Sequence, residues 1–227
     1  MKKHFHYLAL LLPLLLFWLV CAPTYGQEHF VFRVGGGVAS NYGGNTRNVG
    51  AFNIGLGYEY ELDQKWSVEP SVLFFSKGWK DRTQTVPARD DNGNLVYDEE
   101  GHQVFGKKGT KSYAYYIEVP VVANYYIHLS SPHYLNLTAG PYVAIGVGGN
   151  TETYGDTDRQ GAQRFYYKEK TFDLDGVHRF DAGVTLGVGY EYDRRINLSL
   201  NTNLGLLRVS PTGGKNYSLF FAFAYRL

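Results

Sequence analysis

The sequence predicts an all-β protein, an eight-stranded antiparallel up-and-down transmembrane β-barrel, and three observations carry this prediction. Large apolar residues alternate with small or polar residues over eight segments, and a period of two is typical of strands. The connections between these segments are alternately short and long. Aromatic residues make up 16% of the chain beside 27 glycines, a mixture that suits pleated strands and tight turns.

The most continuous alternation is a hairpin over residues 113–147. On its first arm Tyr115, Ile117 and Val119 alternate with Tyr116, Glu118 and Pro120, and the returning arm repeats the pattern after a short turn at 130–132. A tilted transmembrane strand needs about 9–11 residues, so each arm is long enough to cross a membrane.

The same alternation recurs along the rest of the chain. Six further strands are predicted at 29–40, 51–62, 66–79, 178–193, 196–209 and 217–227. Three connections are short (63–65, 129–133 and 193–195) and four are longer (41–49, 80–110, 148–176 and 210–216). Outer-membrane barrels have this asymmetry, with short turns on the periplasmic side and longer extracellular loops.

The N-terminus has the features of a secretory signal peptide over residues 1–26, which leaves a single barrel domain over 27–227. Lys2 and Lys3 precede an apolar run at 7–20, and Thr24 and Gly26 are small residues before the expected cleavage at Gly26/Gln27. The run is shorter than the ~20 residues of a spanning helix. Cys21 is the only cysteine, so no disulfide is predicted; acylation at Cys21 is the less favoured alternative.

Residue type indicates which face of each strand meets lipid. A soluble lipocalin-like barrel also alternates, but its outer face would carry Lys, Arg and Glu. Here the less hydrophobic faces carry Gly, Asn, Ser, Thr and Ala, which fit the packed interior of a narrow barrel. An aromatic girdle is predicted at the short-turn end from Tyr58, Tyr60, Tyr125, Tyr190, Tyr192 and Tyr225. A net charge of +1 argues against a nucleic-acid binder.

The predicted interior contains charged residues that need partners, because an unpaired charge inside a narrow barrel is costly. The acidic residues are Glu59, Glu61, Glu69, Glu118, Asp181 and Glu191, and their possible ion-pair partners are Arg33, Arg179 and Arg226. We interpret this set as a salt-bridge network that fills the barrel. A path for protons or solutes is the alternative.

Three segments carry a family resemblance: YYIEVPVVANYY at 115–126, LTAGPYVAIGVGG at 137–149 and FDAGVTLGVGYEY at 180–192. Together they resemble the PorT-type outer-membrane β-barrel family of Bacteroidetes. The resemblance implies a barrel in the outer membrane. It says less about function, because the family is broad and its namesake is implicated in protein secretion. The insert at 80–110 departs from the family core.

No catalytic residue, cofactor or metal ion is predicted. His102, His133 and His178, with Ser210 and Asp181, are candidates for a catalytic set, but no known catalytic motif surrounds them. The pairs Asp90/Asp91 and Asp156/Asp158 lack the ligand spacing of a calcium site. A barrel enzyme acting on lipid and a narrow channel for small solutes stay open as alternatives.

The long segment 80–110 contains a short internal repeat. Residues 91–98 (DNGNLVYD) and 99–106 (EEGHQVFG) each read as a turn followed by a short hydrophobic strand. We therefore expect a hairpin that protrudes above the membrane and binds a partner protein through Leu95, Val96, Tyr97, Val104 and Phe105. The loop at 148–176 is a second candidate contact. The predicted function is a non-enzymatic binding or scaffold component of an envelope or secretion complex, as a monomer or a subunit; a loop that only shields the barrel is the alternative.

Overall fold

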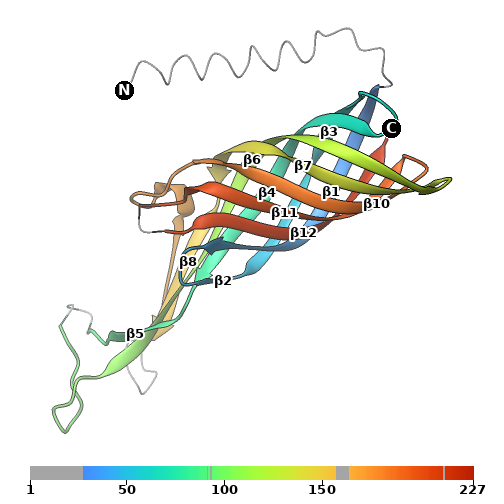
Figure 1. The fold of residues 1–227 in the computed structure, drawn as a ribbon. Coiled ribbons are helices and arrows are strands. Elements are labelled where there is room, and N and C mark those ends of the chain that lie inside the picture. The colour runs from blue at the N-terminus through green and yellow to red at the C-terminus, as the bar shows by residue number, and fades with distance from the viewer. Residues whose placement is uncertain (1–27, 91, 93, 157–163, 212) are drawn as a thin grey trace, which may run out of the picture.

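The computed structural model describes residues 28–90, 92, 94–156, 164–211 and 213–227, and Figure 1 shows its ribbon. Among these residues no helix has the length and apolar character that crossing a membrane requires. The predicted signal peptide with Cys21, and the aspartates at 91 and 158, lie outside the described residues.

Eight long strands form a closed antiparallel ring, as the sequence predicts. They are β1 (Glu28–Tyr42), β3 (Val49–Glu61), β4 (Trp66–Asp81), β6 (Phe105–Ser130), β7 (His133–Gly148), β10 (Phe180–Tyr192), β11 (Ile196–Arg208) and β12 (Lys215–Arg226). Each pairs with the next, and β1 pairs with β12 to close the ring. Closure leaves no unpaired strand edge in the wall, which lipid requires.

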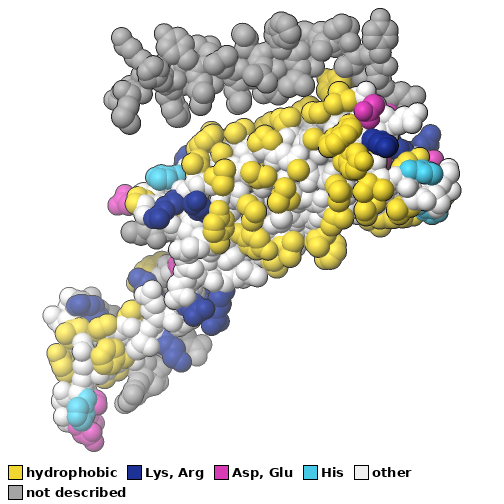
Figure 2. Space-filling view, viewed as in Figure 1, with side chains coloured by type: hydrophobic (Ala, Val, Ile, Leu, Met, Phe, Trp, Pro, Cys, Tyr) yellow, Lys and Arg dark blue, Asp and Glu magenta, His cyan; other side chains and the backbone are white. Residues whose placement is uncertain are grey.

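The two faces of the wall have the predicted character. Outward side chains are large and apolar: Leu56 is 55% exposed and Phe221 72% exposed. Figure 2 shows these hydrophobic side chains covering the barrel wall. Inward side chains are small and polar, and Asn53, Ser67 and Ser218 are fully buried. The wall therefore presents apolar side chains to its surroundings and encloses a polar interior.

Aromatic side chains pack against one another near the short turns. The ring of Tyr58 lies 4.9 Å from that of Phe30 and 4.8 Å from that of Tyr60, and Trp66 lies 4.7 Å from Tyr125. Figure 1 shows that β1 begins beside the C-terminus at this same end, which we call the turn end. The opposite end is the loop end.

An extension of the same sheet projects from the loop end. The first part of β6 runs beyond the wall and pairs with β5 (Gln84–Pro87) on one side and β8 (Asn150–Asp156) on the other, and β9 (Arg164–Lys170) pairs with β8. We call this extension, with the end of β4, the stem, and residues 88–104 at its far end the tip (Figure 1). A short β2 (Thr46–Arg47) and a 3₁₀ turn, η1 (Thr171–Asp173), complete the fold.

The stem arises partly where the sequence predicts only loops. The predicted loop at 148–176 contains β8, β9 and η1. Between β7 in the wall and β8 in the stem, Gly149 adopts φ +137°, and a Cβ there would lie 2.1 Å from the Tyr113 carbonyl oxygen. Only glycine fits this close approach, so Gly149 lets the chain pass from the wall into the stem.

Candidate functional site

Charged side chains inside the barrel form a network whose first group lies near the turn end. The Arg226 guanidinium lies 2.5 Å from the Glu59 carboxylate and 3.4 Å from the Glu191 carboxylate. The Tyr126 hydroxyl donates a hydrogen bond to Glu59. At the mouth, Arg194 binds Glu61 at 2.6 Å. The carboxylates predicted here are thus paired within the protein.

The second group is a single pair, Arg33 and Glu69. One guanidinium nitrogen of Arg33 donates to both carboxylate oxygens of Glu69, at 2.8 and 2.9 Å. This pair lines two small cavities, one of about 20 Å³ toward the turn end and one of about 30 Å³ that Glu118 also lines. Each cavity has room for one or two water molecules. Side chains therefore fill the part of the lumen around the pair.

The third group lies farther toward the loop end and centres on Lys77, which the sequence analysis missed. Its ammonium lies 2.6 Å from Glu118 and 3.3 Å from Asp181. It also lies 4.4 Å from the ring centroid of Tyr142. Asn203 donates to Glu118 and Asn216 to Asp181. Lys77 follows Ser71, Leu73 and Phe75 on the inward face, so continuing the alternation of β4 would have found it.

The prediction of Arg179 as an interior partner is wrong. Its side chain is half exposed and lies 3.3 Å from Asp173, and its guanidinium lies 5.2 Å from the Phe172 ring centroid. Arg179 precedes the first residue of β10, so the strand alternation does not apply to it. Of the eight other predicted interior residues, Glu61 lies at the mouth and binds Arg194. The remaining seven form the three groups with Lys77: Arg33, Glu59, Glu69, Glu118, Asp181, Glu191 and Arg226.

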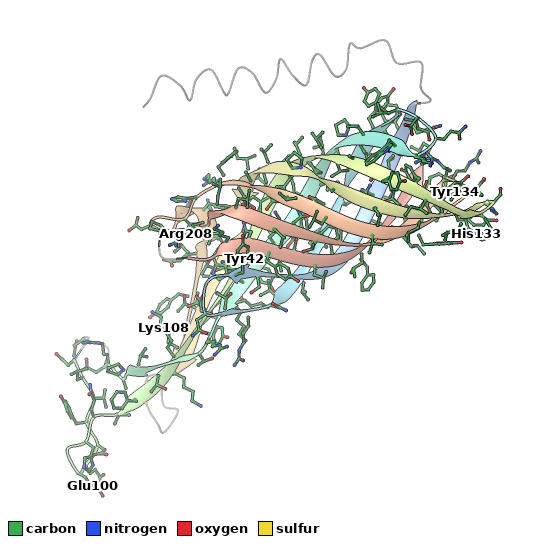
Figure 3. All side chains as sticks on the ribbon, in the orientation of Figure 1. Tyr42, Glu100, Lys108, His133, Tyr134 and Arg208 are labelled. Carbon is green, nitrogen blue, oxygen red and sulfur yellow. The ribbon has the colours of Figure 1, made fainter. Side chains whose placement is uncertain are left out.

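The histidines weighed for catalysis lie far from one another. Figure 3 shows His133 at the turn end and Glu100, a neighbour of His102, on the tip. His133 contacts the Tyr190 hydroxyl, whereas His178 contacts the Arg208 carbonyl oxygen at 3.1 Å at the loop end. Asp181 is bound to Lys77 in the lumen. The described residues therefore do not assemble this set.

The sequence repeat predicted at 91–98 and 99–106 is confirmed in the tip, which contains two similar turns. The Asp90 carboxylate accepts hydrogen bonds from the backbone N–H groups of Asn92 and Asn94. Eight residues later, Asp98 accepts from those of Glu100 and His102 in the same way. Such turns need no bound ion, because the carboxylate is satisfied by its own backbone. We therefore assign the exposed group Asp98, Glu100 and His102 to a hydrogen-bonded turn and not to a metal site.

Leu95, Val96 and Tyr97, three of the predicted partner-binding residues, lie between these two turns, where an isolated β-bridge joins Tyr97 to Gln103. The other two, Val104 and Phe105, follow the second turn. The Val96 N–H donates to the Ala88 carbonyl, and the Val104 N–H donates to the Val96 carbonyl. Val96 and Val104 are half-buried by this pairing. Leu95, Tyr97 and Phe105 are 37%, 56% and 46% exposed. The tip therefore presents an apolar surface far from the wall.

Comparison with known proteins places the fold in a family. Nothing among the curated proteins matches the chain. Among the solved structures, the chain is similar to Ail, the attachment invasion locus protein of Yersinia pestis, with 12% identity over 89% of this chain and 99% of Ail and a TM-score of 0.37. It is also similar to Neisserial surface protein A, with 13% identity over 88% of this chain and 96% of that protein and a TM-score of 0.40. A family model described as an outer membrane protein beta-barrel domain matches residues 27–210, and the chain belongs to this outer-membrane family.

Proposed function

We propose that this protein is a non-enzymatic binding or scaffold component of the cell envelope, in which the barrel is the membrane anchor and the tip contacts a partner protein. One observation carries the proposal: exposed Leu95, Tyr97 and Phe105 lie at the end of a stem that holds them away from the wall. In outer-membrane barrels the short turns are periplasmic, so the tip is extracellular. The filled lumen favours binding over transport.

Two finer assignments belong to the proposal. Residues 1–26 act as a cleaved signal peptide, and the chain is of the PorT type found in Bacteroidetes. The three segments that carry the PorT resemblance lie within the wall strands β6 and β10 and along β7 to its end at Gly148 and the adjoining Gly149, where a barrel family keeps its common core. The tip lies outside these segments, so the resemblance does not identify its partner.

The chemistry of the tip indicates the kind of partner surface. Aromatic and aliphatic side chains are the usual anchors of protein interfaces, and Tyr97 is the most exposed of the three. The acidic side chains of Asp98, Glu99 and Glu100 lie beside it in the chain and are exposed. We infer a partner protein with an apolar pocket bordered by Lys or Arg, since opposite charges at the rim favour correct docking.

A photo-crosslinking amino acid at position 97 in living cells tests this proposal. We expect a covalent adduct with one particular protein, reduced at least tenfold when Leu95→Ser and Phe105→Ser are added. The matched control carries the crosslinker at Leu207, which is 41% exposed near the loop end of the wall. The same adduct at both positions, or one that survives the two substitutions, would exclude the tip as the contact.

A further inference from the structure

One face of the stem carries five lysines. The cross-strand register puts four side chains in one row: Lys80 of β4, Lys111 of β6, Glu152 of β8 and Lys168 of β9. Side chains alternate between the faces of a strand, so Lys107 and Lys170 lie on the same face as this row. Tyr113, Tyr154 and Tyr166 also belong to this face, which we call the lysine face.

The opposite face of the stem has a different charge balance. Among the side chains that the structure describes there, Lys108 is accompanied by Asp81 and Glu169. The lysine face has Glu152 as its one acid among the described side chains. Figure 2 shows Lys and Arg side chains gathered on the part of the stem nearest the hydrophobic wall. The excess positive charge is thus confined to one face of the sheet.

Lys80 and Lys111 face each other on neighbouring strands, and like charges in this position are destabilising in an isolated sheet. Each ammonium rests near an aromatic ring: Lys111 lies 4.7 Å from the ring centroid of Tyr113 and Lys80 lies 5.7 Å from that of Tyr154. Hydrogen bonding with Tyr113 raises the pKa of Lys111, so this lysine is charged at neutral pH.

The one acid of the face compensates only part of this charge. Glu152 lies 3.7 Å from the Lys168 ammonium. The same carboxylate also lies opposite Lys111 in the β6–β8 register, so it is shared between two lysines, and Lys80 faces only Lys111 in the β4–β6 register. The arrangement therefore favours an external anion between Lys80 and Lys111.

The lysine face continues the lipid-facing side of the wall. Tyr115, Ile117 and Val119 point outward on β6, and Lys111 lies four residues beyond Tyr115 on the same side. At ~3.3 Å per residue along a strand tilted by about 40°, Lys111 is about 10 Å above Tyr115 along the membrane normal. Polar headgroups occupy roughly 5–8 Å at each membrane surface. With Tyr115 taken as the edge of the hydrocarbon layer, the backbone of Lys111 lies just above the headgroups, and the long lysine side chains can reach back down to them.

From this charge, register and depth we propose that the lysine face binds the phosphate groups of an anionic lipid in the outer leaflet. Lysine ammonium groups bind phosphate as point charges, and neighbouring tyrosine hydroxyls add hydrogen bonds. The acyl chains of the same lipid extend down the apolar wall below. Bound lipid holds the stem against the membrane surface. This site is separate from the partner contact at the tip and does not depend on it.

The test uses the full-length protein in nanodiscs of neutral phosphatidylcholine that contain a few per cent of bisphosphorylated lipid A. Lipid A that stays with the barrel after detergent exchange is quantified by mass spectrometry. The test variant combines Lys80→Gln, Lys111→Gln and Lys168→Gln. The control combines Lys108→Gln, Arg208→Gln and Lys215→Gln, which removes the same charge from other parts of the loop end. Heat-modifiable gel migration establishes that each variant is folded.

We expect the test variant to retain at least tenfold less lipid A than the wild type, and the control to retain the wild-type amount. Dephosphorylated lipid A is expected to be lost from all three proteins. The proposal is overturned if the test variant retains as much lipid A as the wild type. It is also overturned if the wild type retains dephosphorylated lipid A as well as it retains lipid A. Full competition by millimolar inorganic phosphate would show a general anion site and overturn the assignment to lipid. If the triple variant does not fold, Lys111→Gln alone with the same lipids decides the question.

Discussion

Lys77 of β4 and Glu118 of β6 face each other inside the barrel, with the ammonium 2.6 Å from the carboxylate and both side chains 1% exposed. Asp181 of β10 approaches the same ammonium at 3.3 Å. Strands from two parts of the wall are thus joined through one lysine. Because the pair is buried, each partner depends on the other for its charge to be tolerated.

Replacing Lys77 with Met should destabilise the barrel by about 3–5 kcal/mol, since two carboxylates would stay buried without their cation. The measurement is the urea midpoint of the barrel folded in lipid vesicles. A compensated variant that adds Glu118→Gln and Asp181→Asn should recover most of the loss. A Lys77→Met barrel as stable as the wild type would show that water replaces the ion pair.

The second prediction concerns charged substitutions on the lipid-facing wall. Leu186 is exposed on the outside of β10, and Leu186→Arg should cost ~2–4 kcal/mol near the bilayer midplane. Ile196→Arg provides the control, because this residue begins β11 next to a short turn, where the cost falls to ~0–1 kcal/mol. Unfolding in vesicles compares the two variants. Equal costs at both positions would contradict the depth that we assign to Leu186.

Arg33 and Glu69 separate two small cavities in the lumen, and this supports a prediction about conductance. The wild-type protein should show no large steady conductance in planar bilayers, because side chains fill the interior between the cavities. Arg33→Ser combined with Glu69→Ser removes the pair and should produce small, measurable ion currents. A large conductance of the wild type would instead favour the solute-channel alternative.

The wall of this barrel could be predicted from the sequence because each strand alternates strongly. In β3, for example, Phe52, Ile54 and Leu56 point out while Asn53 and Gly55 point in, so the period of two is visible without any structure. The interior network followed from the same alternation. The interior predicted for β4 ends at Ser71, whereas the inward alternation continues through Leu73 and Phe75 to Lys77.

The stem could be predicted only in part, for a physical reason. Strand β8 reads NTETYGD, and its residues are polar or small on both faces because water contacts the stem. Without an apolar face there is no alternation to recognise. The pairing of β8 with β6 depends on register over a long sequence separation, which local patterns do not contain. The lysine face is a product of this register and was therefore invisible in the sequence.

The tip can be removed without disturbing the barrel, and this is a fourth prediction. Pro87 of β5 and Phe105 of β6 are paired, so Asn-Gly in place of residues 88–104 would close a regular hairpin. The shortened protein should keep heat-modifiable migration and outer-membrane levels while losing the partner adduct. Reduced levels of the folded barrel would mean that the tip contributes to assembly.

The final strand, β12, is needed to close the barrel during assembly. Residues 220–226 of β12 pair with β1 in the register Val31↔Arg226 to Gly37↔Phe220, and the Leu227 N–H donates to the Phe30 carbonyl. In lipid, each unpaired backbone group costs several kcal/mol, so an open ring is not tolerated. Arg226 also provides the cation for Glu59 and Glu191.

Deletion of residues 221–227 should therefore abolish membrane insertion and send the chain to periplasmic degradation. The measurement is the amount of protein in isolated outer membranes, detected with an antibody to the tip. Arg226→Gln is the matched control for charge: it removes the cation from the lumen but keeps the strand, so the barrel should insert with reduced stability. Normal outer-membrane levels after the deletion would show that β1 and β12 need not pair for the ring to close.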